Sequence, residues 1–162
     1  GPDPEVDEIL RISIIDLSGN VIFDHLIKPS YYKAWRSPVT PEMVRNEKII
    51  AMYRDELNQI FSKTDCVIGY NITKDLAFLR NSRITCSKPV IDVKRDFGDY
   101  RRLKDPRFAF DRKYTLESAA AYSGYEWDNQ EEHYSIDNDI ATLQCLRKLY
   151  NAGFYGTPAR QI

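Results

Sequence analysis

The hydrophobic and polar positions at the start of the chain predict a hairpin. Two mostly apolar runs, at 8–17 and 21–27, read as strands. The turn sequence Ser-Gly-Asn at 18–20 separates them. Lys-Pro at 28–29 ends the second run, because proline has no N–H to donate to a strand ladder. The aromatic-rich stretch at 30–39 is expected to be an irregular loop.

Helical spacing dominates the next part of the chain. Thr-Pro-Glu at 40–42 is typical of a helix start, with a capping threonine and proline at the first helical position. Apolar residues recur at helical spacing over 48–62, which predicts one amphipathic helix. Later elements are expected in this order: a buried strand over 65–70, a helix over 73–80, a buried strand over 89–92, a helix over about 93–103, a helix that starts near Tyr114, and a long helix over 135–150.

This order of elements predicts a mixed α/β fold, in which an antiparallel hairpin is followed by strands that alternate with helices. Sheets of this kind carry ligand sites at the carboxyl ends of their strands. Tyr70 and Asn71 come at the end of the strand expected over 65–70, so they are candidate substrate-binding residues. A length of 162 residues suits a single domain over 1–162, with 150–162 as a C-terminal tail.

Composition and charge narrow the function classes. Three widely spaced cysteines argue against a disulfide framework or a zinc site and favour a reduced, cytoplasmic location. No run approaches the roughly 18 apolar residues that a membrane span needs, so no membrane partner is expected. The net charge of −1 does not indicate nucleic-acid binding, but the stretch 94–113 holds eight basic and four acidic residues and is locally +4. That stretch is either a solvated helix and loop or a rim that contacts phosphates.

The segment 67–79 carries the first candidate chemistry. A buried strand ends there in a polar pair, and Asp75 falls on the first turn of the following helix. This places one carboxylate at the mouth of the sheet. From spacing alone, Asp75 could equally be an acid that only complements the helix dipole.

This segment resembles the second motif of the DEDD superfamily of 3′-to-5′ exonucleases, which includes proofreading exonucleases and RNase T. The family motif is an apolar strand, Gly-His-Asn, two variable residues, Phe-Asp, two variable residues and Phe-Leu. The matching residues in this chain are Gly69, Asn71, Asp75, Phe78 and Leu79, and the departures are Tyr70 for His and Lys74 for Phe. The resemblance implies that Asp75 binds metal and takes part in catalysis.

A second segment resembles the third motif of the DEDDh branch of that superfamily. It comprises 113–120, Gly-Tyr at 124–125 and the run 133–142. The resemblance implies that His133 is the general base that takes a proton from the attacking water. Tyr134 would be the corresponding residue in the DEDDy branch, but the histidine and the long helix favour DEDDh.

The same spacing reveals a departure in the third motif. The residue five after His133 is Asn138, where the family has aspartate. The resemblance places Asn138 at a metal-ligand position, where it offers a neutral carbonyl oxygen. Asp137 and Asp139 flank it, but neighbours on a helix point about 100° away, so they are not expected to replace it.

The first family motif, Asp-x-Glu on an opening strand, has no counterpart in the chain. Asp-Pro-Glu at 3–5 has the spacing, but its proline and the lack of a preceding apolar run favour a turn. In the superfamily this strand lies at the centre of the sheet, between the hairpin and the strand at 65–70. The resemblance therefore implies a ribonuclease H-like mixed sheet, truncated at its N-terminus, with its first central strand missing.

The resemblance implies hydrolysis of phosphodiesters at single-stranded 3′ ends by two divalent cations, Mg²⁺ or Mn²⁺. One carboxylate, Asp75, and one amide, Asn138, should hold such a pair of cations poorly. Very weak or no turnover is therefore expected. The alternatives are an inactive exonuclease fold that binds nucleic acid or a protein partner, and an α/β domain with no nucleic-acid role. The sequence does not distinguish DNA from RNA.

Overall fold

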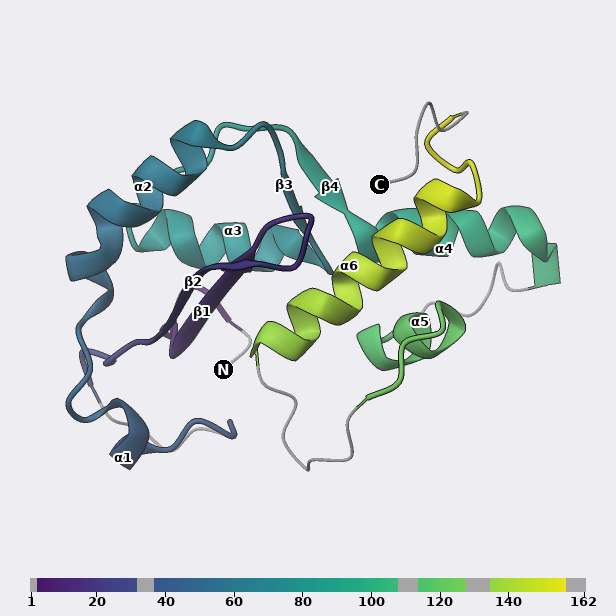
Figure 1. The fold of residues 1–162 in the computed structure, drawn as a ribbon. Coiled ribbons are helices and arrows are strands. Elements are labelled where there is room, and N and C mark those ends of the chain that lie inside the picture. Colours follow the sequence, from purple (N-terminus) through teal and green to yellow (C-terminus); the bar gives the residue numbers. More distant parts are fainter. Residues whose placement is uncertain (1–2, 32–36, 108–113, 128–134, 157–162) are drawn as a thin grey trace.

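A computed structural model describes residues 3–31, 37–107, 114–127 and 135–156 (Figure 1). Its first element pair is the expected hairpin, in which β1 (Arg11–Ile15) runs antiparallel to β2 (Val21–Leu26). Gly19 has a φ of 90°, a left-handed conformation that suits glycine in the tight turn. The register shifts between Ile14 and Ile15, which is the bulge expected where a hairpin twists near its turn.

A second, separate strand pair lies further along the chain. β3 (Val67–Gly69) runs parallel to β4 (Val90–Asp92), and α3 (Ile72–Asn81) lies between them in the sequence. Within the described ranges, β1 and β3 each have one strand neighbour, so the two pairs form two sheets of two strands. The predicted mixed α/β class, with an antiparallel pair followed by a parallel pair, is confirmed.

The remaining elements are helical: α1 (Pro41–Val44), the 3₁₀ turn η1 (Ile50–Tyr53), α2 (Arg54–Lys63), α4 (Val93–Lys104), α5 (Leu116–Tyr122) and α6 (Ser135–Asn151). The single helix expected over 48–62 is thus divided into a 3₁₀ turn and an α-helix. The division falls at Tyr53, whose ring is buried and packs edge-on against Phe23 and face-on against His25. Its docking against the hairpin coincides with the change in helical pitch. No helix in the described part of the chain is both long and apolar enough to cross a membrane.

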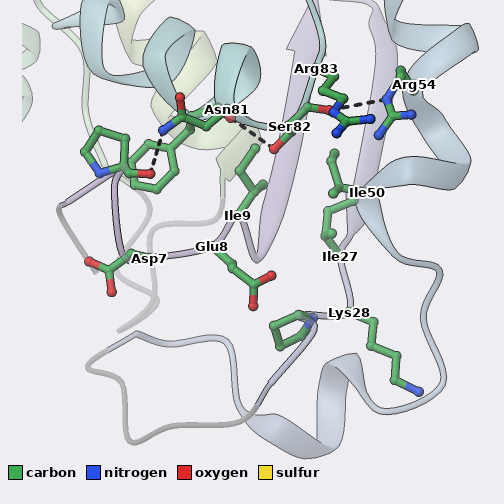
Figure 2. Close-up of a pocket in the computed structure, with 13 residues that line it drawn as sticks. Asp7, Glu8, Ile9, Ile27, Lys28, Ile50, Arg54, Asn81, Ser82 and Arg83 are labelled. Carbon is green, nitrogen blue, oxygen red and sulfur yellow. Dashed lines mark hydrogen bonds between the residues drawn. The ribbon is translucent and has the colours of Figure 1, made fainter.

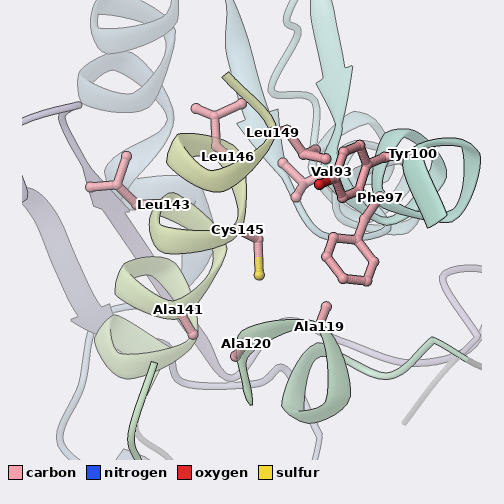
Figure 3. Packing of buried hydrophobic residues seen from close by; sticks show 10 residues of the cluster. All are labelled: Val93, Phe97, Tyr100, Ala119, Ala120, Ala141, Leu143, Cys145, Leu146 and Leu149. Atoms are coloured by element: carbon pink, nitrogen blue, oxygen red, sulfur yellow. The ribbon is translucent and has the colours of Figure 1, made fainter. Parts of the chain in front are cut away.

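Two apolar clusters hold these elements together. The first joins α4, α5 and α6, and in it Phe97 lies beside the small residue Ala119 of α5, while Tyr100 lies beside Val93 and Leu149 (Figure 3). This alanine allows α5 to approach closely. The second cluster joins the hairpin to α2 and the end of α3, around Phe23, Leu57 and Leu79. The long helix expected over 135–150 is α6, and its Leu143, Leu146 and Leu149 are buried in the first cluster.

Gly69 allows the tight junction between β3 and α3. A Cβ atom at this position would lie 2.5 Å from Ile72 Cδ1 and 3.0 Å from Ile72 Cβ. Gly69→Ala should therefore lower the free energy of unfolding by about 1–3 kcal/mol through overpacking, measured by urea denaturation. Gly98→Ala is the matched control, because its Cβ would meet the Tyr114 ring at an ordinary 3.7 Å and alanine favours the helix interior. Equal stability of the two variants would contradict the close approach at Gly69.

Candidate active site

The turn between β3 and α3 is set by Asn71. This residue adopts a left-handed conformation, with φ 62° and ψ 37°, which asparagine tolerates better than most residues. Its backbone N–H donates to Asp92 Oδ1 at 3.0 Å. The left-handed turn reverses the chain after β3 and starts α3 directly, so the first turn of α3 lies next to the carboxyl ends of β3 and β4.

Asp92 joins the two strand ends. As the N-cap of α4, it also accepts hydrogen bonds from the backbone N–H groups of Lys94 (3.0 Å) and Arg95 (3.5 Å). One carboxylate therefore fixes both strand-to-helix junctions. Asp92 was not among the predicted site residues, although an acid between a strand and a helix is a capping signal in the sequence.

Asp75 lies in the first turn of α3, as the sequence predicted. Burial of its carboxyl group raises the pKa of Asp75 to about 6, although the residue as a whole remains exposed to water. The negative charge of Asp92 adds to the rise, and Lys74 opposes it. Asp75 is thus a carboxylate at the strand ends that desolvation and a like charge hold closer to its neutral form.

Asp139, on α6, is a second carboxyl group of this kind. Its Oδ2 accepts a hydrogen bond from the Ser13 hydroxyl of β1, and the Ser13 and Ser135 hydroxyls also contact each other. Burial raises the pKa of Asp139 to about 7, and the negative charges of Asp24 and Asp75 contribute to this rise. The Ser13 hydrogen bond opposes it, because it stabilises the charged form.

An ion pair borders the site on the hairpin side. Arg11 Nε and Nη2 donate to Asp24 Oδ1 and Oδ2 at 2.9 and 2.8 Å, across β1 and β2. The Arg11 charge also acts on Asp139 and lowers its pKa. Charge effects on pKa thus link neighbouring carboxylates in the order Asp24, Asp139, Asp75 and Asp92. The guanidinium of Arg11 lies at the Asp24 end of this series.

Asp139 was not expected to take the place of Asn138 as a metal ligand, and which of the two residues does so stays a prediction; the structure shows only where the Asp139 side chain lies. Ser135 and Asp139 are four residues apart and share a face of α6, and that face meets Ser13 of β1. The backbone carbonyl of Asn138 accepts a hydrogen bond from the Thr142 hydroxyl at 2.8 Å. The available sequence signal for the contact with Ser13 was the spacing of Ser135 and Asp139, whose hydroxyl and carboxylate are four residues apart on the last helix.

Of the other predicted site residues, Tyr70 is held by two backbone carbonyls. The Tyr70 hydroxyl donates to the backbone carbonyls of Tyr114 and Thr115 at 2.9 and 3.0 Å, so it ties the turn before α3 to the start of α5. Burial raises the pKa of Tyr70, which keeps the hydroxyl protonated and able to donate. His133 and Tyr134 lie outside the described residues. The predicted substrate contacts of Tyr70 and Asn71 stay predictions.

The described residues do not form a complete metal centre on their own. Among them, no group of three or more His, Cys, Asp or Glu side chains is arranged to hold a metal ion. Asp75 and Asp139 have the oxygen donors that Mg²⁺ prefers, and their raised pKa values indicate that a nearby cation would stabilise their charged forms. Two carboxylates are still too few to offset two dications at close range.

A pocket lies at the C-terminal end of α3, where Asn81, Ser82 and Arg83 line it (Figure 2). Its volume is about 290 Å³, at the lower limit of typical small-molecule sites. Arg54 Nε donates to the Ser82 carbonyl at one side, and Asn81 Nδ2 donates to the Pro4 carbonyl at another. Neither Asp75 nor Asp139 lines this pocket, so it is separate from the candidate active site.

Comparison with known proteins finds a distant exonuclease relative. RNA exonuclease 4 of Candida glabrata is 27% identical to this chain over 99 residues, which are 59% of this chain and 36% of the relative. The match thus spans about a third of the relative's length. No family model and no solved structure matches the chain. The similarity supports a relationship between this chain and the exonucleases.

Proposed function

We propose that this chain is a nuclease-type domain that acts on phosphodiesters at single-stranded 3′ ends of nucleic acid. The observation that carries the proposal is the electrostatic interaction of Asp75 with Asp139, which is 64 positions away in the sequence: the charge of Asp75 contributes to the raised pKa of Asp139, whose carboxylate contacts Ser13 of β1. The similarity to an RNA exonuclease supports the same reaction class and favours RNA as the substrate.

Within this proposal, Asp75 and Asp139 are two of the carboxylates for Mg²⁺ or Mn²⁺, and Asp139 takes the role that sequence spacing gave to Asn138. When bound, such cations stabilise the attacking and leaving oxygens of a phosphodiester. His133 is the proposed base for the attacking water. Tyr70 and Asn71, at the N-terminus of α3, are the proposed contacts for the terminal nucleotide.

The remaining acids are proposed to come from an Asp-x-Glu strand that inserts between β1 and β3. In the described part of the chain, each of these strands has a neighbour on one edge only, and the two edges belong to separate sheets. An unpaired edge is a template for a further strand. Without that strand, turnover by these 162 residues should be very weak.

A second candidate is an inactive exonuclease fold that binds nucleic acid without cutting it. The observation that favours it is the lack of a three-ligand metal group among the described residues. The two candidates predict different results when an Asp-x-Glu strand is added. The nuclease should then cleave, whereas the binding module should not.

A cleavage assay tests the proposal. A 5′-labelled single-stranded oligonucleotide is incubated in Mg²⁺ or Mn²⁺ with these 162 residues, and with the same residues joined to an Asp-x-Glu strand. We expect stepwise 3′ shortening by the completed domain only, stopped by EDTA and by Asp75→Asn. No shortening by the completed domain would favour the binding module. Efficient shortening by the 162 residues alone would show that they already hold enough acids.

A further inference from the structure

Three cations of α4 and α6 lie over the rings of two tyrosines, the exposed Tyr122 and the buried Tyr100. The guanidinium of Arg101 lies 4.0 Å from the centre of the Tyr122 ring, and Lys148 Nζ of α6 lies 5.9 Å from the same centre. Lys104 Nζ lies 5.8 Å from the ring centre of Tyr100. Arg101, Lys104, Tyr122 and Lys148 are called the basic patch below.

The basic patch includes part of a positively charged helix, α4. α4 holds five basic and two acidic residues, a net charge of +3 in a chain whose net charge is −1. Both acids of α4 are in ion pairs within the helix, Asp96 with Arg95 and Asp99 with Arg102. No ion pair joins Lys104 or Lys148 to another residue of the described ranges. Arg101 also acts on the carboxyl group of Asp105, outside the helix.

The aromatic residue of the basic patch, Tyr122, is held in place by its packing and is partly exposed to solvent. The Tyr122 ring is 42% exposed and packs edge-on against Phe97, which is buried, at a centroid distance of 5.5 Å. Cations held over tyrosine faces are attracted to the ring and lose some of their freedom before any partner arrives. A fixed group of cations beside an exposed ring suits a ligand with regularly spaced anions and flat bases.

We infer that the basic patch is a second nucleic-acid contact, which binds the backbone phosphates of a single strand away from the candidate active site. This inference rests on the proposed function and names a further surface for the same substrate class. Lys148 follows Asp139 by nine residues on α6, which is about 14 Å along the helix and about half a turn around it. The basic patch and the carboxylates therefore lie on different faces of α6, and only a long strand can reach both.

Strand length and charge reversal together test the inference. Binding of 5′-fluorescein-labelled single strands of 4 and 30 nucleotides is measured by anisotropy, in EDTA at low salt. Lys104→Glu with Lys148→Glu should weaken binding of the 30-mer on the order of tenfold, and reduce the slope of log affinity against log salt by about 1.4. In this variant, the affinity for the 4-mer should fall much less than the affinity for the 30-mer.

The matched control is Lys48→Glu with Lys63→Glu. It makes the same change in charge, and Lys48 also lies over a tyrosine, at 5.5 Å from the Tyr53 ring centre. Both control lysines belong to the region around η1 and α2, away from α4 (Figure 1). This variant should bind the 30-mer within about twofold of the wild-type chain. Circular dichroism confirms that both double variants are folded.

Each outcome decides a different point. Equal 30-mer affinities for the two double variants would overturn the basic patch and leave the proposed function untouched. A wild-type chain that binds neither oligonucleotide would count against the nucleic-acid function as well. Binding of polyglutamate in place of the 30-mer, lost in the patch variant, would assign the surface to an acidic protein and overturn the inference.

Discussion

Asp139→Asn is expected to reduce 3′ shortening by the completed domain at least about a hundredfold, because it removes one of the carboxylate charges that a two-cation site requires. Asparagine keeps an oxygen that can accept the Ser13 hydrogen bond, so the local packing should survive. The rate of single-nucleotide removal from a labelled 3′ end measures the effect. Asp75→Asn should have an effect of the same size, because Asp75 is the other carboxylate proposed for the same pair of cations and its charge acts on Asp139.

Asn138→Ala is the matched control for this prediction. If Asp139 is the carboxylate of the third motif, the alanine variant should retain activity within about threefold, because the Asn138 carbonyl, and not its side chain, makes the bond with Thr142. The reverse result, a large loss in Asn138→Ala and little change in Asp139→Asn, would restore the register that spacing predicted. In that register Asn138→Asp should also raise the rate.

The contrast between these two neighbours illustrates which parts of the structure the sequence could predict. Strands and helices follow from local periodicity, so the hairpin, the two short strands β3 and β4 and α6 occur close to their predicted ranges, although β3 and β4 are only partly buried and Val90 is exposed. The end of a strand at Tyr70 and Asn71 is also local, because a polar pair there follows an apolar run and precedes a helix. These features need no knowledge of distant contacts.

The rotation of α6 is a different kind of property. Counting from His133 assigns positions along the helix, but the face that meets the hairpin depends on the contact between Asp139 and Ser13, which are 126 residues apart. The same holds for the separation of the two sheets, which reflects pairing between strands and not the propensity of either strand. Asp75 could therefore be placed in its helix from local spacing, whereas the contact of Asp139 with the hairpin could not.

The raised pKa values of Asp75 and Asp139 also predict how stability depends on pH. Each carboxyl group holds its proton more tightly in the folded chain, with pKa values of about 6 and 7, than in the unfolded chain, where the reference value is 3.8. The folded state therefore binds more protons between those values. The free energy of unfolding should lose this contribution as the pH rises from about 4 to 7.

Asp139→Asn should remove most of this dependence, because asparagine carries no charge at any of these pH values. In EDTA, the variant should match the wild-type chain near pH 4 and exceed its free energy of unfolding by on the order of 2 kcal/mol at pH 8. Urea denaturation at both pH values measures the difference, and Asp65→Asn, at an exposed position between α2 and β3, serves as the control. Parallel curves for Asp139→Asn and the wild-type chain would mean that the Asp139 carboxylate is charged and well solvated, and would remove it from the cluster with Asp75. A gain in stability at pH 8 that Mg²⁺ reproduces in the wild-type chain but not in the variant would identify Asp139 as a group that a cation stabilises.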